Sequence, residues 1–110
     1  MNELDRAIGF YSAVLGATIT KEQHEGMTFA VLPRGDSGVG GCLSPAREGN
    51  QPSQQGALIY LNCQGRLDQA IAGAQPNGGK VLEPKQPIGP YGFRAVVLDS
   101  EGNRIALHSM

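Results

Sequence analysis

Apolar residues recur with a helical period at the beginning of the chain. The spaced apolar positions are Leu4, Ile8, Tyr11 and Leu15. This spacing is typical of a helix that buries one face. Asn2 stands where a helix cap is favoured, and Asp5 follows near the positive end of the helix dipole. Gly16 comes directly after the last apolar position, where a glycine commonly ends a helix. We therefore predict a helix over residues 2–15 that begins with an Asn2 cap.

The pattern changes after this helix to short segments rich in β-forming residues. These segments are residues 17–20 (ATIT), 27–33 (MTFAVLP) and 38–44 (GVGGCLS). The polar stretches HEG and RGDSG separate them, as turns separate the strands of an antiparallel sheet. Residues 44–56 contain almost no apolar side chain, so we expect a loop or linker at this midpoint of the chain.

The second half of the chain repeats the order of elements. Its predicted strands are residues 57–63, 80–84, 92–99 and 103–109, and its predicted helix covers residues 66–79. This order is β-α-β-β-β, whereas the first half reads α-β-β-β and lacks only an opening strand. We predict a single α+β domain with one module over residues 1–50 and a second module over residues 56–110.

Alternation along the predicted strands sorts their side chains into two faces. The apolar face, which we expect to pack on the helices, comprises Ile59, Leu61, Cys63, Ala95, Val97, Ile105 and Leu107. A tight turn over residues 99–102 would set Val96 opposite Ala106, and the same register would set Arg94 opposite His108. The opposite, more polar face comprises Leu58, Tyr60, Asn62, Arg94, Val96, Ala106, His108 and, by the same alternation in the first half, Cys42.

Each polar candidate also has a purely structural interpretation. Arg94 could form an ion pair with a carboxylate such as Glu83, and His108 could be a hydrogen-bonded strand residue. Tyr91 lies in the Gly- and Pro-rich segment 86–93, which could be a loop that covers a ligand or a plain connector. Three further polar residues lack the rest of a calcium-loop pattern and are expected to form the turn: Asp99, Glu101 and Asn103.

Composition and charge argue against nucleic acid and membranes as partners of this protein. The chain has 110 residues, 40% of them apolar, which suits one packed domain. A net charge of −1 gives no basic surface for nucleic acid or an anionic membrane, and no apolar run approaches the roughly 20 residues of a membrane helix. No basic segment followed by an apolar one marks a secretory signal. Cys42 and Cys63 form no CxxC motif, so we expect a reduced, cytoplasmic protein. A single disulfide between these two cysteines is the alternative.

Three segments in the same order carry a family resemblance. They are ELDRAIGFYSAVLGA (3–17), GGKVLEPK (78–85) and LDSEGNRIALHS (98–109). Together they resemble the glyoxalase, bleomycin-resistance and extradiol-dioxygenase superfamily, also called the vicinal oxygen chelate proteins. The resemblance implies paired βαβββ modules whose mixed sheets curve into a cup, usually completed in a homodimer. The family's first strand is missing from the pattern here: either the chain is clipped, or its start is placed late, or another chain supplies the strand. An uncovered neighbouring edge would invite pairing with a partner.

The resemblance also implies where a metal would bind. Family metalloenzymes take ligands from four strands; the first strand is missing here, and the other positions fall near Cys42, at Leu58 and at Ala106. Leucine and alanine have no donor atom, whereas a divalent ion needs about three or more N, O or S ligands. We therefore expect a degraded metal site with no metal ligands, and no cofactor.

These observations favour a small-molecule binding protein that takes an anionic or oxygen-rich organic ligand, since arginine binds carboxylate and phosphate groups bidentately. The expected ligand contacts are Tyr60, Asn62, Arg94, Val96, Ala106, His108, Cys42, Leu58 and Tyr91. One alternative is a lyase, isomerase or dioxygenase of the same superfamily, with His108 as general base and Arg94 stabilising an anion. A second alternative is a protein-interaction module whose cup is filled by a partner chain.

Overall fold

The computed structural model describes residues 1–34, 38 and 40–110, and these residues form two sheets and two helices. The first half contains α1 (Leu4–Leu15), β1 (Lys21–His24), β2 (Met27–Val31) and β3 (Cys42–Leu43). The second half contains β4 (Ile59–Asn62), α2 (Leu67–Ala74), β5 (Lys80–Pro87), β6 (Phe93–Leu98) and β7 (Arg104–Ser109). Short 3-10 helices cover Gln75–Asn77 and Gly89–Tyr91. The predicted order of elements in the second half is confirmed.

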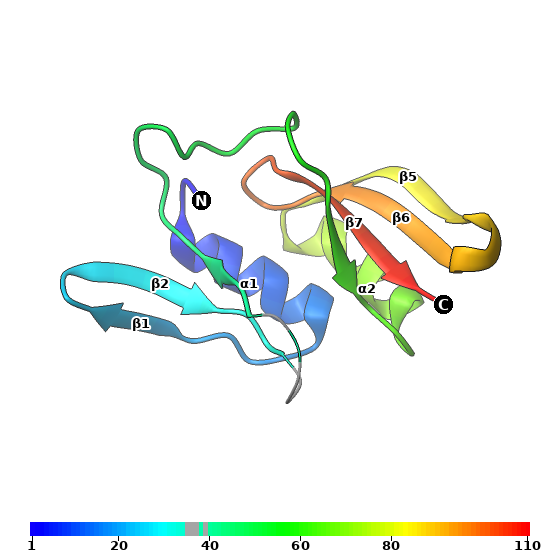
Figure 1. The fold of residues 1–110 in the computed structure, drawn as a ribbon, viewed down its shortest axis with the longest axis horizontal. Coiled ribbons are helices and arrows are strands. Elements are labelled where there is room, and N and C mark those ends of the chain that lie inside the picture. The colour runs from blue at the N-terminus through cyan, green and yellow to red at the C-terminus, as the bar shows by residue number, and fades with distance from the viewer. Residues whose placement is uncertain (35–37, 39) are drawn as a thin grey trace.

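Each half contributes its own sheet. One sheet has the order β1-β2-β3 and is antiparallel, and the other has the order β4-β7-β6-β5, in which only β4 and β7 run parallel. Figure 1 shows α1 and α2 side by side on one side of these sheets, so each sheet has one covered and one open face. This arrangement confirms the α+β class. Neither helix of the described chain has the length and apolarity that a membrane crossing requires.

Helix α1 differs from the sequence expectation at its start and in its buried stripe. The N-cap is Glu3, without a side-chain cap, so the predicted Asn2 cap is wrong. The carboxylate of Glu101 instead accepts the Glu3 backbone N–H at 2.7 Å. The helix ends as predicted at Gly16, whose φ is 66°. The side chains it buries are Leu4, Ala7, Phe10, Tyr11 and Val14, so the stripe is rotated away from Ile8 and Leu15.

The predicted strand over residues 17–20 is wrong. The hairpin of β1 and β2 closes with His24 opposite Met27, and its pairing begins only at Lys21. Residues 17–20 therefore lie beyond the paired region, and Ile19 packs into the core instead, with 4% of its surface exposed. The predicted strand over residues 38–44 shortens to β3. Residues 35–37 of the RGDSG turn and residue 39 lie outside the described part of the chain.

The β1–β2 turn offers a test of local backbone strain. Glu25 and Gly26 both have positive φ, 52° and 79°, as a two-residue type I′ turn requires. Asparagine tolerates this conformation better than glutamate. We expect Glu25→Asn to raise the free energy of unfolding by about 0.5–1 kcal/mol in urea denaturation. Glu25→Gln, which removes the charge without relieving the backbone, should change it little; equal effects of the two variants would contradict this interpretation.

The β6–β7 hairpin has the predicted register. Val96 pairs with Ala106 and Arg94 pairs with His108. As predicted, the turn is held by polar side chains, because the Asp99 carboxylate accepts the backbone N–H groups of Glu101 and Asn103 at 2.8 and 2.9 Å. The face toward the helices is buried at Ala95, Val97, Ile105 and Leu107, also as predicted.

Strand β4 matches the expected apolar face only in part. Cys63 and Leu61 pack with the core as expected, but Ile59 is 56% exposed, so its predicted packing under the helix is wrong. The reason is topological: β4 is the edge strand of its sheet, and nothing among the described residues pairs with its outer side.

Candidate functional site

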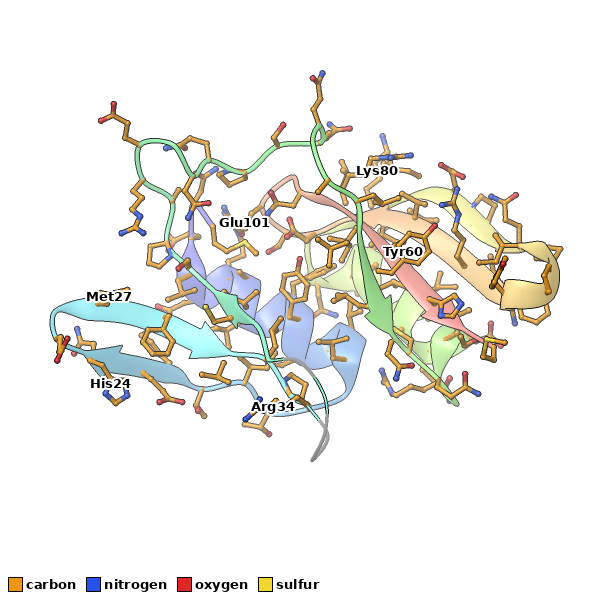
Figure 2. The ribbon with its side chains drawn as sticks, in the orientation of Figure 1. His24, Met27, Arg34, Tyr60, Lys80 and Glu101 are labelled. Carbon is orange, nitrogen blue, oxygen red and sulfur yellow. The ribbon has the colours of Figure 1, made fainter. Side chains whose placement is uncertain are left out.

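A polar cluster lies on the open face of the second sheet, and its centre is the contact between Arg94 and Tyr60. Arg94 Nη1 donates a hydrogen bond to the Tyr60 hydroxyl at 2.5 Å, and the guanidinium lies 5.9 Å from the centre of the Tyr60 ring. Figure 2 shows the Tyr60 side chain extending from β4 across this face. The two residues come from β6 and β4, strands separated by β7. The sheet thus joins side chains that are distant in sequence.

Glu83 links the cluster to a second arginine. Its carboxylate lies 3.5 Å from Arg94 Nη2 and 3.1 Å from Arg104 Nη2, and it also accepts a hydrogen bond from Gln86 Nε2 at 3.1 Å. The possible ion pair of Arg94 with Glu83 is therefore present. One carboxylate shared by two guanidinium groups leaves the cluster with an excess positive charge. Because these side chains are all partly exposed, that charge faces solvent and any ligand in it.

His108 joins the cluster from β7 and has a defined tautomer. Its ring lies 6.1 Å from the Tyr60 ring, and its Nε2 lies 2.6 Å from the backbone oxygen of Tyr91. A carbonyl oxygen only accepts hydrogen bonds, so Nε2 must carry the hydrogen. In the neutral ring, the lone pair therefore sits on Nδ1. Tyr91 itself contributes its backbone, while its side chain is 70% exposed.

Val96 and Ala106 lie in the centre of this face but have no exposed surface. In the sheet register Ala106 lies beside Tyr60 and Val96 lies beside Glu83. Because neither is exposed, a ligand would touch Val96 or Ala106 only after neighbouring side chains moved aside. As ligand contacts, these two residues stay predictions.

The other predicted contacts lie at the border of the cluster or away from it. Asn62 points its Oδ1 to the backbone N–H of Gln64 at 2.9 Å, which is a turn-forming role. Leu58 precedes β4 and is half-buried. Cys42 is exposed on β3, in the other sheet, where it lines a cavity of about 430 Å³ together with Ile59. The structure does not bring Cys42 into the cluster.

Arg104 is the cluster residue that the sequence reasoning missed. The signal was present, because Arg104 precedes Ala106 and His108 at the same two-residue spacing and so belongs to the same face. In the structure it pairs with Leu98 across the hairpin and reaches Glu83 on β5.

The fold and the sequence both match known proteins. A family model described as the Glyoxalase/Bleomycin resistance protein/Dioxygenase superfamily matches residues 1–107. The chain belongs to this superfamily. The resemblance seen in its sequence segments is thereby confirmed.

Individual members of the glyoxalase/bleomycin-resistance superfamily are similar at different levels. CFP32, a candidate glyoxylase of Mycobacterium tuberculosis (strain CDC 1551 / Oshkosh), is 33% identical over 99 residues, which are 89% of this chain and 36% of CFP32. This chain therefore spans about a third of that relative. A glyoxalase/bleomycin resistance protein from Albidiferax ferrireducens T118 superposes with a TM-score of 0.75 at 21% identity, covering 100% of this chain and 92% of that one.

Two further superfamily structures share the fold. A family enzyme from Burkholderia phytofirmans PsJN has a TM-score of 0.71 at 16% identity over 99% of this chain and 91% of its own. A V278E mutant of glyoxalase I from Zea mays has a TM-score of 0.62 at 19% identity and covers 97% of this chain, but only 42% of the maize protein is matched. At these identities the likeness establishes the fold and leaves the chemistry open.

The residues present do not fit the metal centre that this superfamily implies. Of the positions expected to supply ligands, Leu58 and Ala106 have no donor atom, and Ala106 is also fully buried. Cys42 alone offers a donor, and the described residues contain no group of three or more His, Cys, Asp or Glu side chains arranged to hold an ion.

Proposed function

We propose that this protein binds a small anionic organic molecule on the open face of its second sheet, at the cluster of Arg94, Tyr60, Arg104 and His108. The observation that carries the proposal is the sharing of Glu83 by two arginines, which leaves positive charge uncompensated. Guanidinium groups present paired N–H donors that match carboxylate and phosphate oxygens. Tyr60 and His108 would add a hydroxyl and a ring at the edge of the bound anion.

The arrangement also suggests how such a ligand is received. Glu83 lies between the two arginines and is held further by Gln86. An incoming carboxylate would compete with Glu83 for the same N–H donors, and Gln86 Nε2 and solvent would remain as the hydrogen-bond donors of the displaced Glu83 carboxylate, which is 35% exposed. Tyr60, which is 47% exposed, holds Arg94 in place during this exchange.

We expect Arg94→Gln to weaken binding of malonate and inorganic phosphate at least tenfold, because a charged hydrogen bond contributes about 1.5–3 kcal/mol. Isothermal titration calorimetry at low ionic strength measures this directly. Arg47→Gln, a substitution at an exposed position of the loop before β4, is the matched control and should leave binding unchanged. Equal losses in the two variants would show only a general charge effect, and no binding of either anion to the unmodified protein would overturn the proposal.

A catalytic function of the same face is the second candidate, and the tautomer of His108 favours it. With Nε2 donating to the Tyr91 carbonyl, Nδ1 is the basic atom, and Arg94 lies directly across the hairpin to stabilise an anion. Exchange of the methyl protons of pyruvate in D₂O, followed by NMR, is a simple probe of proton abstraction. Exchange that exceeds the buffer rate and disappears in His108→Ala supports catalysis; exchange at the buffer rate argues against it. The homodimer and the cytoplasmic location stay predictions.

A further inference from the structure

The charged groups of the anion cluster stand in a fixed order, with one carboxylate between two guanidinium groups. Glu83 Oε1 lies 3.5 Å from Arg94 Nη2, and Glu83 Oε2 lies 3.1 Å from Arg104 Nη2. Each arginine therefore faces a different oxygen of the same carboxylate. The order of charges is positive, negative, positive, and the three groups in contact carry one positive charge in excess.

The strand register explains this order and leaves all three groups open to solvent. Glu83 stands in the row of Val96 and Ala106, while Arg94 lies two residues to one side of this row and Arg104 two residues to the other. The side chains of Arg94, Glu83 and Arg104 are 24%, 35% and 36% exposed. A ligand that approaches this face therefore meets the two arginines with the carboxylate between them.

Arg94 has a hydrogen-bond donor that the cluster leaves unused. Its Nη1 donates to the Tyr60 hydroxyl and its Nη2 faces Glu83, but its Nε is buried and has no partner among the described residues. A buried donor without a partner costs free energy, and a carboxylate can accept from two N–H groups of one guanidinium at once. A ligand carboxylate that takes Nε and Nη2 of Arg94 together would make a bond that Glu83 does not make.

Displacement of Glu83 has a cost that depends on the ligand. A ligand with carboxylates alone leaves Glu83 with Gln86 Nε2, 3.1 Å away, and solvent, and it also brings like charge beside the Glu83 carboxylate. A ligand that also carries an ammonium group removes both penalties, because an ammonium has three N–H donors and the opposite charge. The cluster therefore favours a ligand that has an ammonium next to its carboxylates.

We propose that this cluster binds an amino dicarboxylate, a molecule such as aspartate in which the carbon that carries the ammonium lies between two carboxylates. One carboxylate binds Arg94, the other binds Arg104, and the ammonium binds the displaced Glu83. The charges of this ligand run negative, positive, negative, so every charge of the cluster gains an opposite partner. The inference rests on the proposed anion site and names the class of its ligand.

L-Aspartate and succinate test the proposal, because they differ only in the ammonium group. We expect isothermal titration calorimetry at low ionic strength to show L-aspartate binding about fivefold more tightly than succinate, the size of one partly exposed ion pair. L-Asparagine, in which an uncharged amide replaces the second carboxylate, should bind about fivefold more weakly than L-aspartate. Binding of L-asparagine as tight as that of L-aspartate would contradict the role of the second arginine.

Glu83→Gln tests whether Glu83 is the group that reads the ammonium. This variant keeps the shape of the side chain but leaves two positive charges, so succinate should now bind at least as tightly as L-aspartate. Glu48→Gln, at an exposed position of the loop before β4, is the matched control and should keep the preference for L-aspartate. Unchanged circular dichroism spectra would show that both variants keep the fold. A preference for L-aspartate that persists in Glu83→Gln would overturn the proposal.

The outcomes separate this inference from the anion site on which it rests. Binding of succinate and malonate without any preference for L-aspartate would overturn the choice of ligand class and leave the anion site standing. Absence of binding of L-aspartate, succinate and malonate alike would overturn both.

Discussion

Replacing Glu101 with glutamine should lower the free energy of unfolding by about 2–3 kcal/mol at pH 7. The Glu101 side chain is fully buried and ties the β6–β7 turn to the start of α1. It accepts hydrogen bonds from Arg6 Nε at 2.8 Å, from the Glu3 backbone at 2.7 Å and from the Ser100 hydroxyl at 2.9 Å. Figure 2 shows Glu101 between the turn and the helix. Glutamine has nearly the same shape but no charge, and its amide cannot accept all of these bonds.

The contribution of Glu101 should depend on pH with a definite sign. Chiefly through its hydrogen bond with Arg6, and also through the Glu3 N–H, the pKa of Glu101 falls from an ordinary 4.5 to about 2. A group with a lowered pKa stabilises the fold above its unfolded pKa and loses that contribution as the pH falls through the folded pKa. The difference between Glu101→Gln and the unmodified protein in urea denaturation should therefore be full at pH 7 and shrink between about pH 4.5 and pH 2.

Glu48→Gln is the matched control, because Glu48 is an exposed residue of the loop before β4. It should change stability by less than about 0.5 kcal/mol at every pH. A Glu101→Gln difference that stayed constant from pH 7 to pH 2 would contradict the assigned pKa. The neighbouring Tyr11 should be unaffected in this range, because burial and the Asp99 carboxylate raise its pKa well above the ordinary value.

Gly92→Ala should destabilise the protein by about 3 kcal/mol and release His108 from its hydrogen bond. Gly92 has φ 91° and ψ −130°, a conformation that residues with a side chain avoid. An added Cβ would also collide with the backbone of Ser109 and Met110. Relieving the collision must move the segment that carries the Tyr91 carbonyl, which holds His108 Nε2. Urea denaturation measures the stability loss, and the ring signals of His108 in NMR report the broken contact.

Gly89→Ala is the control from the same segment. Gly89 also has a positive φ, 69°, but an added Cβ there meets no atom within 4 Å. Gly89→Ala should lower the free energy of unfolding by about 1 kcal/mol, which is the cost of placing a side chain at a positive φ. The NMR signals of His108 should stay unchanged. Equal losses for the two variants would mean that the close approach of Gly92 to the last strand has no energetic consequence.

The sequence predicts this fold best where local signals agree. The β6–β7 register follows from a polar turn and from strict alternation, and a slip of one residue would have buried Arg94 and His108. The pattern places a strand at the β-rich residues 17–20, whereas the structure begins β1 at Lys21, because the tight turn at Glu25 determines which residues pair. The tie between Glu101 and Glu3 spans 98 residues, and no local pattern signals it.

The sequence likewise predicts some features of the candidate site and not others. Tyr60, Arg94 and His108 were placed on one face by alternation, and the structure brings them into contact. Arg104 obeyed the same rule and was overlooked. The bond from His108 to Tyr91 involves a backbone carbonyl, so the identity of the side chain at position 91 carries no signal of it. The exposure of Ile59 depends on which strand forms the sheet edge, and that is a property of the whole topology.

Titration with malonate, followed by NMR of the arginine side-chain N–H groups and the histidine ring, tests the proposed anion site most directly. We expect saturable shifts of Arg94 Nε–H, Arg104 Nε–H and the His108 ring, with a single dissociation constant for all three. The amide of Cys42, which lies in the other sheet, should stay unchanged. If malonate causes no saturable shift, or shifts only groups outside the cluster of Arg94, Tyr60, Arg104 and His108, then the open face of the second sheet is not the ligand site.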